Sequence, residues 1–575
     1  MKTLSAFFLL AVSLSITLSV TLAARAEEGS PLADIVIKNA RVYTMDAARR
    51  WQQSVAVKAD RIIYVGTDDG AAKHIGPGTR VIDAHGGMVM PGMFDCHIHL
   101  ADGGVHLNEC NLDDCKTGSE VLKRVKDYAA SKPDLEWIRG AGWSLPLFKD
   151  GNPSKKDLDE IISDRPVFLE SQDYHSGWAN SAALARAGIT HDTRDPEGGR
   201  IERDEKGEPT GTLRETAMHI IQKLIPERSR QDYAAGLRRG QELANRLGIT
   251  SIQDAWVNME LLTAYDDLNR EGNLKVRVNT AWKIDPEKDF GPQVHRMRGL
   301  RDRYSRDMVS FSSAKLFADG VIEAHTAALI EPYIGIDDKM ESDELNFPGE
   351  KMREIVALLE KSGFQVHVHA IGDRAVRTTL DAFQHCRESS DAGLALRHHI
   401  AHLELIDSKD IPRFRELGVT ATVQPFWCHR DKYVEELTEP VLGPERSRDI
   451  YPLGALYRSG ARLAGGSDWP VSSLNPFDAM EVAVRRAPPG EAGAESWLPH
   501  QKVALQACLE AYTINGAFVN HCEDRRGSIE EGKDADLILL DRDLFASSPE
   551  TIHETRVLMT LVGGRIVHQD GGLLP

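Results

Sequence analysis

The sequence predicts an α/β protein: a (β/α)₈ TIM-type barrel with a long insertion, plus a small β-sandwich formed from both chain ends. From about Val89 to Val519, apolar strand-like runs alternate with amphipathic helical stretches, a pattern typical of a parallel sheet whose eight repeats close into a barrel. Both chain ends carry short β-branched runs that are too few to bury a face alone. The chain has 575 residues, against about 250 for a barrel.

The two ends of the sandwich are predicted at residues 33–88 and 521–575. The first part has a run from Asp34 to Asp46, broken at Asn39, and a strand pair from Ser54 to Gly66 that turns at Ala59. The second part has three apolar runs, which begin at Asp536, Val557 and Gly563. Pairing the two ends in one sandwich buries a face of each.

Residues 89–520 are predicted to form the barrel. Helical stretches at 232–247, 349–362 and 407–417 are each followed at once by a strand-like run. Residues from about 105 to 215 do not follow this alternation. We expect them to form a long insertion over the mouth of the barrel.

The composition is that of an ordinary globular protein, with 41% hydrophobic and 27% charged residues. The net charge of −18 leaves no basic surface for nucleic acid or anionic lipid, so neither is expected as a partner. Seven cysteines are too few for a disulfide scaffold, and their odd number leaves at least one free thiol. A pair between Cys110 and Cys115 stays open.

Residues 1–26 resemble a secretory signal peptide. An uncharged apolar stretch follows Lys2, and Ala24-Arg25-Ala26 provides a small-residue cleavage site. The alternative is an uncleaved membrane anchor. We favour cleavage, which predicts a periplasmic or secreted protein. No later segment has 18 consecutive apolar residues, so no other membrane span is expected.

The strongest local motif is Pro91-Gly-Met-Phe-Asp-Cys-His97-Ile-His99. Positions two apart on a strand point to the same side, so His97 and His99 present two imidazoles together at the end of an apolar strand. Neutral imidazole is a common metal ligand. A bare His-x-His also occurs by chance in protein cores, so this motif alone does not decide for a metal.

Other strand-like runs end in further candidate ligands. The C-terminal ends of barrel strands converge on one mouth, where active sites lie. Four histidines and one aspartate gathered there would make a zinc-type site of nitrogen and oxygen ligands. The additional residues at strand ends are His369, His402, Asp468 and Lys315.

Several blocks in order resemble the metal-dependent amidohydrolase superfamily, and within it the exoenzyme-regulator-like branch. This branch is the YtcJ-like or amidohydrolase 3 group, which includes N-substituted formamide deformylases. The resemblance runs from about Ala33 to Val567. Besides the His97 motif, it rests on Lys315-Leu-Phe-Ala-Asp-Gly, His369-Ala-Ile-Gly-Asp-Arg-Ala, His402-Leu-Glu-Leu-Ile, Gln424-Pro, Gly466-Ser-Asp468-Trp-Pro and Gly532-Lys-Asp-Ala-Asp-Leu.

The resemblance implies one or two divalent metals, most simply Zn²⁺. A free ammonium has no lone pair, so Lys315 can be a ligand only as its N6-carboxylated form, which bridges two metals in many family members. The alternatives are a lysine that pairs with Asp319 or with a substrate carboxylate, and a mononuclear site that uses His97, His99, His369 and Asp468. The full implied ligand set is His97, His99, Lys315, His369, His402 and Asp468.

Substrate contacts are harder to predict. The block Tyr174-His175-Ser-Gly-Trp resembles a family block that would place His175 over the metal. Glu323 and His325 depart from the family pattern after Asp319-Gly320, which leaves the substrate class in doubt. Trp143, Trp427 and Trp469 are candidate apolar walls, and packing in a core is the alternative for each.

Three further histidines are interpreted as structural. By strand alternation His398 shares the face of His402 but lies lower in the barrel, and His399 is grouped with it. His367 lies one layer below His369, so we expect it behind the metal ligands.

The expected function is hydrolysis of non-peptide carbon–nitrogen bonds through a metal-activated water. The favoured substrates are linear amides such as N-formyl, N-acyl or aryl amides, and carbamates, cyclic amides and esters are the alternatives. Asp468 would act as base and then acid, with His402 or His175 stabilising the oxyanion. A non-catalytic scaffold and an isomerase or lyase in the same barrel stay open. The expected partner is a small-molecule substrate, and a homodimer is expected by resemblance only.

Overall fold

The computed structural model describes residues 31–196, 198–336, 345–390 and 392–571, so the predicted signal peptide lies outside the described residues. Its central element is an eight-stranded sheet in which every neighbouring pair is parallel. In order around the sheet, the strands are β8 (Met93–Ile98), β15 (Ile249–Val257), β16 (Arg277–Lys283), β17 (Val309–Phe317), β18 (Gln365–Ala370), β19 (His399–His402), β20 (Thr420–Val423) and β21 (Leu463–Gly465).

The two outer strands of this sheet meet at their C-terminal ends. The Asp468 amide donates to the carbonyl of His97 over 2.7 Å, and the His99 amide donates to the carbonyl of Trp469 over 2.9 Å. The chain that follows β21 therefore lies against the end of β8. The predicted barrel fold is confirmed.

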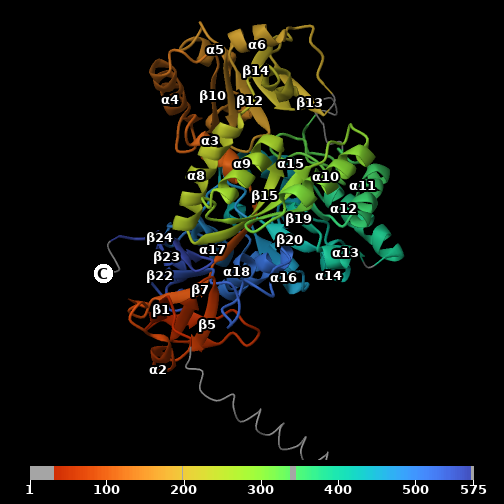
Figure 1. The fold of residues 1–575 in the computed structure, drawn as a ribbon. Helices are drawn as coiled ribbons and strands as arrows, with labels where there is room; N and C mark the ends of the chain where they lie inside the picture. The colour runs from red at the N-terminus through yellow and green to blue at the C-terminus, as the bar shows by residue number, and fades with distance from the viewer. Residues whose placement is uncertain (1–30, 197, 337–344, 391, 572–575) are drawn as a thin grey trace, which may run out of the picture.

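Helices cover the outside of the barrel (Figure 1). Helix α8 starts at a capping box in which Ser229 and Asp232 satisfy each other's backbone amides. Its buried residues, among them Leu237 and Ala244, lie on one face, as expected for an amphipathic helix. The covering helices include α8 (Arg230–Arg246), α9 (Met259–Arg270), α10 (Phe290–Tyr304), α11 (Gly349–Lys361), α12 (Asp373–Ser389), α14 (Ile411–Leu417), α16 (Leu453–Arg458), α17 (Pro476–Arg485), α18 (Leu505–Tyr512) and α19 (Ile514–Val519).

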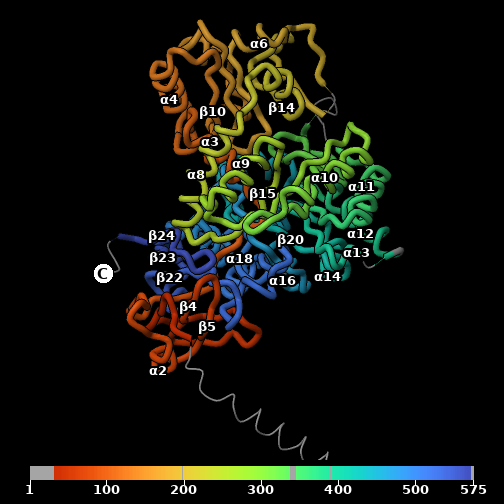
Figure 2. The backbone as a smooth tube through the Cα atoms, viewed as in Figure 1, coloured from red at the N-terminus to blue at the C-terminus, as the bar shows by residue number. Residues whose placement is uncertain are grey.

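Both chain ends join in two small sheets, as the sequence predicts. Figure 2 shows the N-terminal strands and the C-terminal strands side by side at the lower end of the molecule. Ile37, Val57, Leu539 and Leu561 share the core between the sheets. One sheet has the order β5 (Arg61–Gly66), β4 (Ser54–Lys58), β1 (Ile35–Lys38), β6 (Arg80–Asp83), and the other has the order β24 (Arg565–Gln569), β23 (Val557–Val562), β22 (Leu537–Leu540), β7 (Met88–Pro91), β2 (Arg41–Tyr43), β3 (Trp51–Gln52).

The position of strand β7 corrects the predicted start of the barrel. Residues 88–91 pair with β2 and β22 and so belong to the end sheet rather than to the barrel. The first barrel strand begins at Met93, not at Val89. Both segments are buried and apolar, so hydrophobicity alone could not separate them.

Residues 110–215 form a lobe above the barrel, which we call the upper lobe (Figure 1). Its sheet is mixed rather than parallel. Helices α4 (Gly118–Ser131) and α6 (Ser181–Ala187) lie in this lobe. The sheet order is β13 (Gly199–Arg203), β14 (Pro209–Glu215), β12 (Ser176–Ala179), β11 (Val167–Ser171), β10 (Ile138–Trp143), β9 (Cys110–Asn111).

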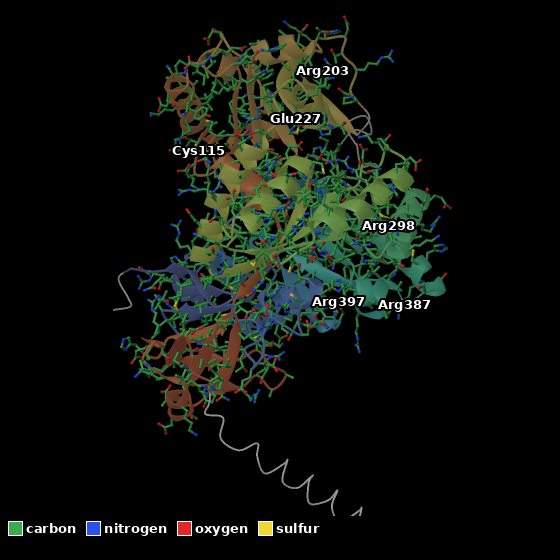
Figure 3. The ribbon with its side chains drawn as sticks, viewed as in Figure 1. Cys115, Arg203, Glu227, Arg298, Arg387 and Arg397 are labelled. Carbon is green, nitrogen blue, oxygen red and sulfur yellow. The ribbon has the colours of Figure 1, made fainter. Side chains whose placement is uncertain are left out.

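All seven cysteines are buried, and none of them is in a disulfide bond. Cys115 lies in the upper lobe (Figure 3), where it shares a core with Cys110 without a bond between them. The pair that the sequence left open is therefore not formed in this structure. None of the described helices is long and apolar enough to cross a membrane.

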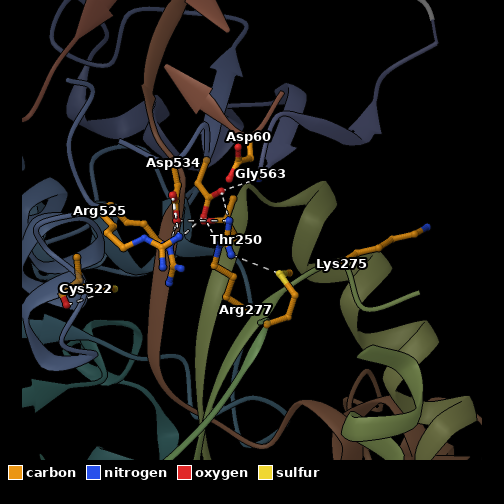
Figure 4. Close-up of polar contacts among 12 residues, drawn as sticks. Asp60, Thr250, Lys275, Arg277, Cys522, Arg525, Asp534 and Gly563 are labelled. Atoms are coloured by element: carbon orange, nitrogen blue, oxygen red, sulfur yellow. Dashed lines mark hydrogen bonds and ion pairs between the residues drawn. The ribbon is translucent and has the colours of Figure 1, made fainter. Parts of the chain in front are cut away.

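A cluster of arginines and aspartates joins the end sheets to the bottom of the barrel (Figure 4). Arg277, at the start of β16, contacts Asp536 at 2.7 Å and Asp534 at 3.6 Å. Asp534 also pairs with Arg61 at 2.6 Å and Arg526 at 2.8 Å. We call Arg61, Arg277, Arg525, Arg526, Asp534 and Asp536 the junction cluster.

Candidate metal centre

Three of the predicted ligands lie together at the mouth of the barrel. Nε2 of His97 and Nε2 of His99 are each 3.3 Å from Oδ1 of Asp468. One donor atom from each of the three residues falls within a group no more than 4.8 Å across. His97 and His99 close β8, and Asp468 follows β21, so the closure of the barrel brings the three together.

The other predicted ligands surround this group. Nδ1 of His402 is 3.9 Å from Oδ2 of Asp468, and Nζ of Lys315 is 3.2 Å from Nε2 of His97. The ring of His369 lies 4.4 Å from the ring of His402, measured between centroids. Nε2 of His369 points at the carbonyl of Gly320, so its Nδ1 is the atom left for a ligand. All six residues therefore line one site.

The donor set fits a divalent cation. Oδ1 of Asp468 and Nδ1 of His402 are buried and have no hydrogen-bond partner among the described residues. Orphaned polar atoms of this kind are costly unless a ligand satisfies them. Burial, together with the charge of Lys315, lowers the pKa of His97 to about 3, so His97 is neutral and can bind a cation.

Lys315 is fully buried, and burial lowers the pKa of its amine to about 7. The partner that the sequence offered as an alternative, Asp319, is engaged elsewhere. Its two oxygens accept the backbone amides of Ala328, Ile371 and Gly372 at 2.9 to 3.1 Å. Asp319 thus holds the loop that follows β18.

Two side chains hold His97 and its strand from behind. Nε2 of His367 lies 2.8 Å from Nδ1 of His97, which places His367 where the sequence predicted, directly behind a ligand. Asp95 accepts the amide of His97 at 3.2 Å and that of Ser467 at 3.1 Å, and so ties β8 to the segment that carries Asp468. A second layer of this kind orients metal ligands.

The prediction for His398 was wrong in its orientation. His398 faces outward, where its Nε2 pairs with Glu360 on α11 at 3.0 Å. His399 faces inward, and its ring lies 3.9 Å from that of His367. The cause is the backbone of His402, whose φ of 77° is left-handed and breaks the strand alternation.

The upper lobe contributes His175 to the site. Its ring lies 5.7 Å from that of His369, and its Nδ1 is 2.9 Å from both oxygens of Glu215. Burial acts to lower the pKa of His175, but the carboxylate of Glu215 raises it to about 9. His175 is therefore an imidazolium at neutral pH.

The three tryptophans that were predicted to line the substrate site lie in different environments. Trp427 lines a pocket and stacks on His402, with 5.5 Å between ring centroids. Trp143 is fully buried in the upper-lobe core, where its Nε1 donates to Leu169, so its prediction as a substrate contact was wrong. Trp469 packs in a barrel core, against Gly103, and does not line this pocket.

His325 also lies away from the pocket lining. Its ring is 5.5 Å from that of Tyr333, and burial lowers its pKa to about 4. The sequence reasoning missed Asp95, Glu215 and Glu404. Asp95 and Glu404 stand inside the quoted motifs, which was a usable signal, whereas nothing local links Glu215 to His175.

Comparison with known proteins fits this geometry. Residues 80–568 match the model of the amidohydrolase family. The chain belongs to the amidohydrolase family. It is therefore a metal-dependent hydrolase, and the resemblance read from the sequence is confirmed.

Two relatives match over most of their length. The N-substituted formamide deformylase of Arthrobacter pascens is 27% identical over 566 residues, which cover 94% of this chain and 99% of the relative. The exoenzymes regulatory protein AepA of Pectobacterium carotovorum subsp. carotovorum is 30% identical over 446 residues, which cover 75% of this chain and 93% of the relative.

Solved structures agree in fold. An uncharacterized metal-dependent hydrolase from Pyrococcus horikoshii OT3 superposes with a TM-score of 0.70 at 27% identity, covering 90% of this amidohydrolase and 99% of that chain. Atrazine chlorohydrolase TrzN from Arthrobacter aurescens TC1, solved with zinc, has a TM-score of 0.51 at 15% identity and shares the fold alone.

Proposed function

We propose that this amidohydrolase cleaves linear amides, such as N-formyl, N-acyl or aryl amides, at a zinc-dependent centre. The observation that carries the proposal is the cluster of imidazole nitrogens around Asp468, in which two buried ligand atoms have no hydrogen bond within the described chain. The likeness to a formamide deformylase over nearly the whole chain supports the substrate class.

His97, His99 and Asp468 would hold the metal, together with His369, His402 and Lys315. A bound divalent cation lowers the pKa of water from 15.7 to about 7 and polarises a carbonyl. Lys315 would contribute as the N6-carboxylated form. Its buried amine, with a pKa of about 7, is partly neutral at physiological pH and can react with CO₂ as a nucleophile.

Asp468 would carry the proton. A carboxylate oxygen of Asp468 accepts it from the attacking water and then delivers it to the departing nitrogen, because an amide anion is too poor a leaving group. The imidazolium of His175, held by Glu215, would face the oxygen on which negative charge develops. The upper lobe would thus supply an electrostatic partner that the barrel lacks.

The proposal includes export. The apolar stretch and small-residue cleavage site within residues 1–26 support a periplasmic or secreted location. N-terminal sequencing of the protein released from its producing cells would show a new terminus close to residue 27. A protein that retains Met1 would count against cleavage of this segment.

The test is metal content combined with a substrate screen. We expect stoichiometric zinc in the purified protein, hydrolysis of linear amides, loss of activity with a chelator and its return with Zn²⁺. Carbamates, cyclic amides and esters form the comparison set. Activity that survives complete metal removal, or that favours one of these other classes, would contradict the proposal.

A further inference from the structure

The pocket beside the metal centre has an unusual charge. Its cavity volume is about 130 Å³, which is room for more than a single ion or water molecule. Four carboxylates line it: Asp173 from the upper lobe, Glu323 from the segment after β17, Glu404 from the segment after β19, and Asp431. In the described chain no lysine or arginine lines the pocket, and His429 is its one basic side chain.

Some of these carboxylate oxygens have partners within the protein. Oε1 of Glu323 accepts the hydroxyl of Thr438 at 2.6 Å, and Oδ1 of Asp431 accepts the amide of Val434 at 3.0 Å. Oδ1 of Asp173 accepts the amide of His175 at 3.1 Å. All three donors are neutral groups, so none of these three hydrogen bonds pairs a carboxylate with a cation.

Two oxygens have no partner in the part of the chain that the structure describes. They are Oε1 of Glu404 and Oδ2 of Asp173. Glu404 is only 2% exposed, so solvent does not satisfy it. A buried acceptor of this kind is available to a donor from a bound ligand.

Aromatic rings complete the walls. Phe426, Trp427, Tyr433 and Tyr451 line the same pocket. Such rings attract cations through their faces, and they exclude water, which strengthens the field of nearby carboxylates. Since Trp427 stacks on His402, the pocket opens directly beside the metal centre.

We propose that this pocket binds the protonated amine or guanidinium of a cationic amide substrate. The cationic group donates N–H bonds to Glu404 and Asp173 between the aromatic walls, while the scissile amide reaches the metal centre past Trp427. The inference rests on the proposed amide hydrolysis and specifies its substrate class. An inorganic cation would leave most of a pocket of this volume, and its aromatic walls, without a role.

The first test compares two amides of matched length on the zinc-loaded full-length protein. N-(4-aminobutyl)formamide carries an ammonium where N-pentylformamide carries a methyl group. We expect kcat/KM to be at least about tenfold higher for the cationic amide. Equal values, or a preference for the neutral amide, would overturn the proposal.

The second test changes the pocket. In Glu404→Gln, and separately in Glu323→Gln, the ratio of kcat/KM for the cationic to the neutral amide should fall about tenfold or more. Glu435→Gln is the matched control, since Glu435 is exposed and pairs with Arg430 outside the pocket. An unchanged ratio in both pocket variants would contradict the assignment, and using two variants protects the test against the misfolding of one.

A binding measurement separates this inference from the proposed reaction. Isothermal titration of the zinc-loaded protein with benzylammonium should show binding that Glu404→Gln weakens, whereas benzyl alcohol, its neutral counterpart, should bind much more weakly. If no amide is hydrolysed but benzylammonium binds in this way, the cation pocket stands and the amidase proposal falls. If amides are hydrolysed but the two probes bind alike, the cation pocket falls alone.

Discussion

Asp468 is the residue on which the other donors of the metal centre converge. Its φ of 55° is left-handed, a conformation that aspartate tolerates better than most residues, and it turns the side chain toward His97 and His99. Burial acts to raise the pKa of Asp468, but the surrounding imidazoles of His97, His99 and His402 outweigh it and hold that pKa well below its usual range. The carboxylate is therefore ionised and ready to accept a proton.

We expect Asp468→Ala to fold normally and to lose about 10²–10⁴-fold in kcat, because both a metal ligand and the proton carrier are removed. Steady-state kinetics with zinc supplied in excess measures the loss, and circular dichroism checks the fold. Asp114→Ala is the control, because Asp114 is exposed and pairs with Arg124, away from the metal centre. Turnover close to that of the unaltered protein would exclude Asp468 from the chemistry.

His367 acts on the metal through His97. Since Nε2 of His97 faces Asp468, its Nδ1 is left to donate to Nε2 of His367. We expect His367→Ala to weaken zinc binding about 10–100-fold, as measured by chelator competition. His367→Gln can still accept that hydrogen bond and should recover part of the affinity. Equal affinities in all three proteins would show that His367 only fills space.

The sequence could predict single residues where local geometry is regular. His97 and His99 were found because a spacing of two on a strand puts both on one side. The turn of His402 could not be found in the same way, because a left-handed φ at a histidine has no sequence signal, and the orientations of His398 and His399 were misassigned with it. Trp143 was misassigned because a tryptophan in a core and a tryptophan in a pocket look the same in the sequence.

At the scale of elements, the junction cluster connects the C-terminal segment to the bottom of the barrel. Asp534 is fully buried and contacts four arginines, among them Arg61 at 2.6 Å and Arg526 at 2.8 Å. Removing this one carboxylate would leave several buried or half-buried guanidinium groups without their partner. The cost should appear as lost stability rather than lost chemistry, because the cluster lies at the opposite end of the barrel from the metal centre.

We expect Asp534→Ala to lower the free energy of unfolding by about 3–5 kcal/mol, the cost of removing one partner from a buried ion pair. Thermal unfolding measures it as a lower Tm. Zinc content and kcat at low temperature should stay close to those of the unaltered protein. A Tm that does not change would mean that the arginines find other partners.

The junction cluster should also make the stability of the folded protein depend on pH in the acid range. Burial acts to raise the pKa of Asp534, but the arginines outweigh it and lower the pKa below 3.8. A carboxyl whose pKa is depressed in the folded state stabilises it at neutral pH and loses this contribution as pH falls through that folded pKa. The difference in Tm between Asp534→Ala and the unaltered protein should therefore shrink below about pH 4. A difference that is constant with pH would assign the effect to packing.

For the molecule as a whole, the sequence predicts the layout better than the contacts. The barrel and the shared end sheets follow from strand and helix periodicity, which is local. The position of β7 depends on which distant strand pairs with it, and the contact of His175 with His369 depends on how the upper lobe lies against the barrel. Neither is encoded by a local pattern, so both became visible only in three dimensions.

The last prediction concerns this contact between lobe and barrel. His175 directly precedes β12, and Glu215 is the last residue of β14. The sheet of the upper lobe therefore holds the pair together above His369. The carboxylate raises the pKa of His175 to about 9. If the imidazolium stabilises the oxyanion, kcat/KM falls as pH rises through that pKa.

In Glu215→Gln the charge that stabilises the imidazolium is lost, so the pKa of His175 should drop. We expect the alkaline limb of the pH profile of kcat/KM to move by about one to three pH units toward neutral. His175→Ala should remove this limb and lower kcat/KM, and adding Glu215→Gln to it should cause little further loss, because Glu215 acts through His175. Thr326 also donates to Glu215, so Thr326→Val serves as the comparison: it alters the same carboxylate's environment but keeps its charge. An alkaline limb that stays in place in Glu215→Gln would show that the upper lobe covers the metal centre without taking part in its electrostatics.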